Sequence, residues 1–172
     1  MESAVIENGA AVLTVADVGI DSLRGLLADY GLLCEQIADG GSIPGSFWGD
    51  SEAGLIGDRL LVRADTPVHS ALHEACHYMC MTPDRRQGLH TDAGGDYDEE
   101  NAVCYLQILL ADRLAGVGGA RLMQDMDSWG YTFRLGSSSA WFGGDAQDAC
   151  GWLRERGLVD GEGNPVYRLC DE

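Results

Sequence analysis

The residues best suited to chemistry are His73-Glu74-Ala75-Cys76-His77, which form the pattern His-Glu-x-x-His. On a helix, two histidines four residues apart share one face and lie about one turn apart. Both imidazoles can therefore reach one Zn²⁺ ion at about 2.0–2.1 Å. Glu74 is offset from His73 by about 100° of helix rotation, so it can approach a zinc-bound water without being a ligand. The pattern predicts a zinc site with Glu74 as general base.

Two further residues share the face of the histidines. His69 and Cys80 lie within about 40° of His73 around the same helix. Each could be an additional ligand, although three residues on one straight helix do not easily surround a tetrahedral ion. The alternative for the whole face is a set of ordinary surface or core histidines with no metal.

We expect the third ligand to come from a second helix, which carries Glu99 and Glu100. Glu99 lies within about 20° of Leu106 and Leu110 and so falls in the middle of an apolar stripe. A carboxylate in a protein core is costly unless it is paired or bound to a metal. We therefore predict Glu99 as the ligand. Alternatively, Glu99 forms a capping-box-like pair with Asp96.

Glu100 is the other candidate for the third ligand. It lies about 100° from Glu99, in a more polar sector that also holds Cys104 and Gln107. His90, in the loop between the two helices, could donate a hydrogen bond to a developing oxyanion or be an unremarkable loop residue.

The motif helix and the second helix have clear sequence boundaries. Thr66-Pro67 reads as an N-cap followed by proline at the first helical position, which predicts a helix over 67–81 that stops before Pro83. The second helix is predicted over 97–114, ending at Gly116. Arg85 and Arg86 would then be cations near the end of the first helix, or contacts for an acidic substrate group.

The remaining elements are predicted from shorter patterns. Apolar residues at helical spacing predict a packing helix over 20–38. Short apolar runs broken by glycine over 46–63 predict two or three antiparallel strands, the last over 59–63. The tail should hold a shorter helix near 145–156 and a small hairpin around 160–164.

Together these features resemble a zincin metallopeptidase of the gluzincin type, and most of all the compact ImmA/IrrE-like peptidases. Those proteins place a strand pair directly before the motif helix, as residues 55–63 do here, and carry their glutamate in an E-x-x-A pattern. Glu99-Glu100-Asn101-Ala102 matches that pattern. The resemblance covers roughly residues 50 to 115.

The length of 172 residues predicts a single domain over 1–172. The resemblance implies a zincin-like α+β fold for it, with a small antiparallel sheet packed on the motif helix and a second, ligand-bearing helix. His73, His77 and Glu99 would bind Zn²⁺, and Glu74 would take a proton from the water that attacks a peptide bond. The strand over 60–63 would be the edge along which a peptide substrate pairs. The alternative function is a non-catalytic, zinc-stabilised interaction or regulatory module, with Cys80 or His69 as a fourth ligand.

Composition excludes several other chemistries. The 172 residues include 28 acidic and 11 basic ones, a formal charge of −17, and every basic residue is arginine. No phosphate-loop lysine and no Schiff-base lysine can exist. Such an acidic chain is not expected to bind nucleic acid. Five acids, Asp92, Asp96, Asp98, Glu99 and Glu100, crowd near the expected third ligand, where Zn²⁺ would offset their repulsion.

Localisation is predicted from the first residues and the six cysteines. The segment MESAVIENGA is acidic where a secretory leader would be basic, and no stretch approaches the ~20 apolar residues of a membrane span. We expect free thiols in a reducing cytoplasm and no contact with membranes.

Overall fold

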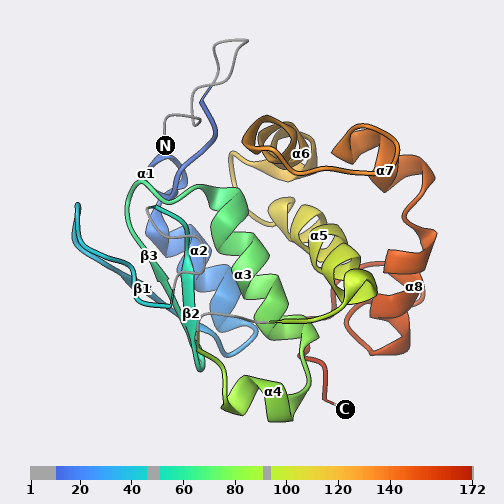
Figure 1. Cartoon of the computed structure of the whole chain (residues 1–172), viewed down its shortest axis with the longest axis horizontal. Helices are drawn as coiled ribbons and strands as arrows, with labels where there is room; N and C mark the ends of the chain where they lie inside the picture. The colour runs from blue at the N-terminus through green and yellow to red at the C-terminus, as the bar shows by residue number, and fades with distance from the viewer. Residues whose placement is uncertain (1–10, 46–50, 91–93, 172) are drawn as a thin grey trace.

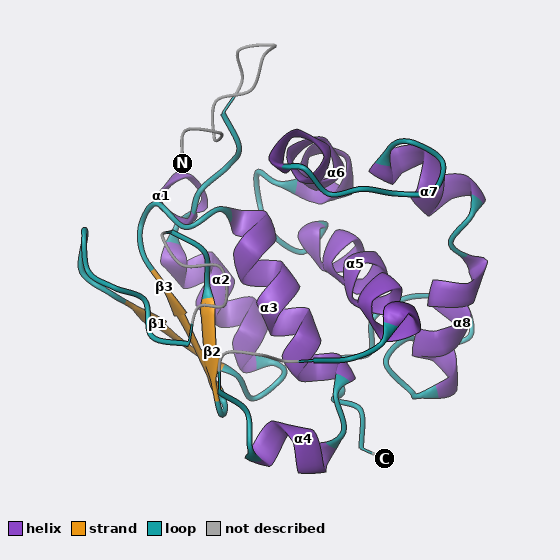
Figure 2. Cartoon of the chain, viewed as in Figure 1, coloured by secondary structure: helices purple, strands orange, loops and turns teal. Residues whose placement is uncertain are grey.

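The computed structural model describes residues 11–45, 51–90 and 94–171. Over these residues the chain forms an α+β fold with eight helices and one three-stranded sheet (Figures 1 and 2). The elements are α1 (Val15–Val18), α2 (Ile20–Ala28), β1 (Leu33–Gln36), β2 (Gly54–Ile56), β3 (Arg59–Val62), α3 (Val68–Cys80), α4 (Pro83–Gln87), α5 (Tyr97–Ala111), α6 (Gly118–Trp129), α7 (Ser138–Gly144) and α8 (Gln147–Glu155).

The sheet is mixed, whereas the sequence predicted an antiparallel one. Its strand order is β1-β3-β2, with β2 antiparallel and β1 parallel to β3. The antiparallel pair β2–β3 agrees with the prediction. β1 comes from the segment that was predicted to continue α2: the helix ends at Ala28, and Gly31 turns the chain with φ 73°. The part of the predicted strand region at residues 46–50 lies outside the described residues.

β3 is the central strand, so the predicted role of residues 60–63 as a peptide-binding edge is wrong. Both sides of β3 are already paired, with Leu60 opposite Cys34 on one side and Leu55 on the other. β2 is an edge strand, but its outer side is partly covered. The Leu55 N–H donates to the carbonyl of Gly45 at 3.2 Å, and Ile56 forms a β-bridge with His90.

α3, which carries the motif, lies between the sheet and α5 (Figure 1). It begins one residue later than predicted because Thr66 has another role: its hydroxyl accepts a hydrogen bond from the Arg63 N–H at 2.8 Å, and Pro67 becomes the N-cap. At the other end, Arg86 donates to the carbonyls of Tyr78 and Met81. This confirms the prediction of a cation at the helix C-terminus for Arg86, whereas Arg85 instead donates to Glu99.

α5 is the second predicted helix and packs against α3, α6 and α8. Asp96 is its N-cap and accepts a hydrogen bond from the Glu99 N–H at 2.9 Å. The helix ends at Ala111, three residues before the predicted end. α8 lies close to its predicted range, and a bridge between Val159 and Pro165 closes the small hairpin after it. The sequence did not predict α6 and α7.

All six cysteines are free thiols. In the described part of the chain, the helices are too short or too polar for any of them to cross a membrane.

Candidate metal centre

Three donor groups from α3 and α5 meet at one point. Nε2 of His73 lies 2.9 Å from one carboxylate oxygen of Glu100, and Nε2 of His77 lies 3.0 Å from the other. The ligand atoms of all three residues lie within 4.8 Å of one another, and no other set of three His, Cys, Asp or Glu residues does so in the described chain. Two imidazoles and a carboxylate with nitrogen and oxygen donors suit Zn²⁺.

Glu99, the predicted third ligand, is not part of this group. Its side chain is buried, as the apolar stripe predicted, but it accepts hydrogen bonds from the Arg85 guanidinium at 2.7 and 2.9 Å. Gly95 lies directly against it: a Cβ atom there would be 2.6 Å from a Glu99 carboxylate oxygen. The Arg85 guanidinium on α4, and not a metal ion, therefore compensates the buried charge of Glu99.

Gln107 sets the orientation of the His73 ring. Its side-chain N–H donates to the carbonyl of His69 at 3.1 Å, and its side-chain oxygen lies 2.7 Å from Nδ1 of His73. Because that oxygen can only accept, His73 carries its proton on Nδ1. In the neutral ring, Nε2 is then an unprotonated donor for a metal. His77 has no such partner: its Nδ1 is buried without a hydrogen bond in the described chain.

Burial and the hydrogen bonds between the three side chains shift the pKa values of Glu100 and His73. Burial raises the pKa of Glu100, but the hydrogen bonds from His73 and His77 lower it more, so that the net shift is strongly downward. Burial lowers the pKa of His73, but its surroundings, which include Tyr131, Cys104 and Glu100, raise it overall. A metal ion at this point must displace protons from the imidazoles, so protons and metal compete.

Glu74 lies close to His73 and His77 but is not one of the three donors. Its side chain is buried, and its carboxylate makes no hydrogen bond or ion pair to a described residue. Burial raises its pKa, while the charges of His73 and His77 partly offset that rise. A carboxylate that is desolvated and close to two metal donors is suited to accept a proton.

The two candidate additional ligands on α3 have other surroundings. His69 is buried, with Nδ1 3.2 Å from the Tyr131 hydroxyl and its ring 5.0 Å from that of Trp129. Burial lowers the pKa of His69 to about 3, which keeps it neutral. Cys80 is also buried, and burial raises the pKa of its thiol well above the usual range. Neither belongs to the three-donor group.

Several residues near the centre were missed from the sequence. Glu52 accepts hydrogen bonds from the Ser70 hydroxyl and the Trp129 indole N–H, both at 2.8 Å, which ties α6 and the segment before β2 to α3. Only Gln107 had a detectable signal, because it shares the polar sector of α5 with Glu100. His90 is exposed and pairs with β2. Asp92 lies outside the described residues.

Comparison with known proteins does not identify a relative of this chain. Compared with known protein families, with curated proteins and with solved structures, the chain matches none of them.

Proposed function

We propose that this protein is a zinc-dependent peptidase with a zincin-like site. The proposal rests on one observation: two histidines of a His-Glu-x-x-His helix and a carboxylate from a second helix form a three-donor group with the motif glutamate unpaired beside it. Three protein ligands leave a coordination position open, which is the arrangement of catalytic zinc sites.

The proposed ligands are His73, His77 and Glu100, with Glu100 in place of Glu99. Glu100 already spans the two imidazole nitrogens, whereas Glu99 is held by Arg85. The side chain of Glu100 is 48% exposed, so it can turn toward an ion without breaking core packing. Gln107 holds His73 in the tautomer that a metal needs.

The chain's own contribution to hydrolysis is made by Glu74. Bound Zn²⁺ would polarise the substrate carbonyl and acidify a water molecule. Glu74 would accept the proton of that water and pass it to the leaving amine. Because burial raises its pKa, Glu74 is a stronger base than an ordinary carboxylate and holds the accepted proton more tightly. This suits a group that must both take and return a proton near neutral pH.

The non-catalytic alternative is less well supported. A structural zinc site is closed by four protein ligands. His69 and Cys80, the two residues that could close it, lie outside the three-donor group, and His69 is engaged by Tyr131. No other described His, Cys, Asp or Glu joins the group.

Metal content is the first test. Protein purified without chelators should contain about one equivalent of zinc by elemental analysis. His77→Ala should lose it, whereas His90→Ala, which replaces an exposed histidine outside the group, should retain it. Wild-type protein without zinc after incubation with excess ZnCl₂ would refute the metal site.

Hydrolysis is the second test. Zinc-loaded protein should cleave members of a peptide library, and Glu74→Gln should keep its zinc but lose at least 10²-fold in rate. Zinc without cleavage in both proteins would instead favour the non-catalytic module. Equal cleavage by Glu74→Gln would refute the mechanism.

A further inference from the structure

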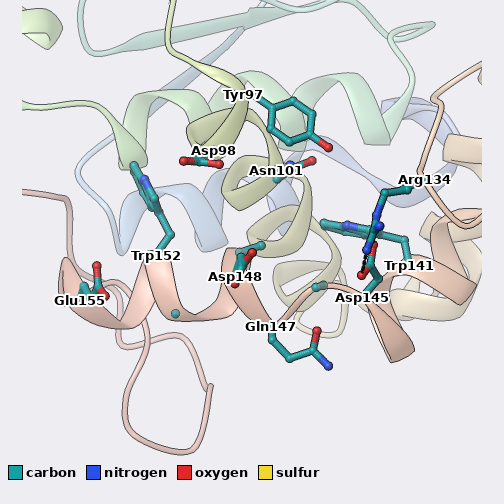
Figure 3. A pocket seen from close by; sticks show the side chains of 13 residues that line it. Tyr97, Asp98, Asn101, Arg134, Trp141, Asp145, Gln147, Asp148, Trp152 and Glu155 are labelled. Atoms are coloured by element: carbon teal, nitrogen blue, oxygen red, sulfur yellow. Dashed lines mark hydrogen bonds and ion pairs between the residues drawn. The ribbon is translucent and has the colours of Figure 1, made fainter.

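A second candidate site lies on the opposite side of α5 from the histidines. A pocket of about 530 Å³ is bounded by the first turns of α5, the segment after α6, and α8. Its size lies within the range of small-ligand sites. Figure 3 shows Tyr97 on one wall, Trp152 on another and Asp148 across from Tyr97, with their side chains around a common hollow.

The pocket carries negative charge that the protein does not neutralise. Asp145 pairs with Arg134, and Glu155 lies 3.8 Å from Arg156. Asp98 and Asp148, in contrast, form no ion pair with a described residue. Both carboxylates face water in the pocket lining, in a chain of formal charge −17. The pocket therefore attracts cations.

Its aromatic side chains add a preference for a particular cation. Tyr97 is 73% exposed, which leaves a large ring uncovered at the mouth of the pocket. The Trp152 ring already has a guanidinium over it, since Cζ of Arg156 lies 3.8 Å from the ring centroid. A guanidinium is weakly hydrated, stacks on aromatic faces, and can donate two parallel hydrogen bonds to a carboxylate.

We propose that this pocket binds the guanidinium of an arginine side chain in a partner peptide. Tyr97 would stack on the guanidinium, and Asp98 and Asp148 would accept its hydrogen bonds. The site needs no metal and does not depend on the proposed hydrolysis, so either proposal can fail alone.

The test is a calorimetric titration of the full-length protein with acetyl-Ala-Arg-Ala-amide, whose blocked ends carry no charge. Saturable binding that weakens at least tenfold with citrulline in place of arginine, and several-fold with lysine, is expected. Equal binding of the arginine and citrulline peptides, or no saturation with arginine, would overturn the proposal.

Variants locate the binding. Tyr97→Ala and the double variant Asp98→Asn/Asp148→Asn should each weaken binding of the arginine peptide about tenfold or more. The control Asp29→Asn/Asp39→Asn removes the same charge from exposed sites elsewhere and should bind almost as wild type does. Asp98 and Asp148 also lie in the first turns of α5 and α8. If their variants lose thermal stability but not binding, they only offset the helix dipoles and the proposal is wrong.

Discussion

Two adjacent glutamates on α5 have opposite environments. Glu99 is 6% exposed and bonded to Arg85, while Glu100 is exposed and reaches both imidazoles. One step along a helix turns a side chain by about 100°, so Glu99 meets Arg85 while Glu100 meets the two histidines.

Exchanging each glutamate for glutamine should separate these roles. Glu100→Gln should lower the zinc content well below one equivalent. It should also lower the free energy of unfolding of the metal-free protein, because His73 and His77 lose the carboxylate that pairs with both of them. Glu99→Gln should keep the zinc but lower the free energy of unfolding by about 1–3 kcal/mol, because Arg85 loses its charged partner. Elemental analysis and urea denaturation measure the two effects. Loss of zinc in Glu99→Gln together with its retention in Glu100→Gln would restore Glu99 as the ligand.

The sequence predicted that the two histidines share a helix face, that Glu74 lies close to them and that Glu99 is buried, because each follows from helical spacing. It could not choose between the two glutamates. That choice depends on Arg85, which α4 places beside Glu99, and the sequence pattern near Pro83 predicted only the end of a helix. Because Arg85 belongs to a separate helix, the spacing of residues along α5 does not indicate that it pairs with Glu99.

His69 should make stability depend on pH. Burial lowers its pKa to about 3 in the folded protein, whereas an unfolded histidine titrates near 6.5. Between these values the unfolded chain binds a proton that the folded chain does not. The free energy of unfolding contributed by this group is therefore complete above about pH 6.5 and falls as pH falls, by up to ~1.4 kcal/mol per unit.

Urea denaturation of chelator-treated protein between pH 7 and 4 measures this dependence. His69→Gln should have a shallower slope than wild type, and the control His90→Gln should have the wild-type slope. Equal slopes for all three proteins would show that His69 does not remain neutral in the fold.

At the scale of elements, β1 shows where spacing misleads. Leucines and Tyr30 continue at helical intervals past Ala28, so the pattern predicted one long helix. The chain instead turns at Gly31, with φ 73°, and enters the sheet beside β3. A glycine with positive φ ends a helix readily, but glycine also occurs within helices, as Gly25 does in α2. Only the tertiary pairing with β3 distinguishes the two cases.

Replacing glycine by alanine should have opposite effects on stability at Gly45, which has a positive φ, and at Gly25, which lies within α2. Gly45 has φ 78°, and a Cβ atom there would lie 2.6 Å from Ile56 and 2.9 Å from the Leu55 carbonyl. Gly45→Ala should lower the free energy of unfolding by about 1–3 kcal/mol. Gly25→Ala meets no atom within 4 Å and should raise it by about 0.5–1 kcal/mol. Thermal and urea unfolding measure both changes, and a stable Gly45→Ala protein would contradict the packing of residue 45 on β2.

At the scale of the whole molecule, the charge of −17 opposes compaction. Raising NaCl from 10 to 150 mM shortens the Debye length from about 30 to about 8 Å and should raise Tm of the metal-free protein by several degrees. Sucrose at matched osmolality controls for effects unrelated to charge. A Tm that falls with salt would mean that ion pairs such as Arg85–Glu99 outweigh the general repulsion.

The first two turns of α5 serve three neighbours at once. Glu99 faces α4, Glu100 faces the histidines of α3, and Tyr97 and Asp98 face the pocket beside α8. Almost no side of this segment is left to vary freely. A one-residue insertion here would turn the side chains that follow it by about 100° around the helix and away from their present partners. The same insertion in the exposed turn at 160–164 would alter only a loop. Natural variation in such a protein should therefore accumulate by substitution around a segment whose length cannot change.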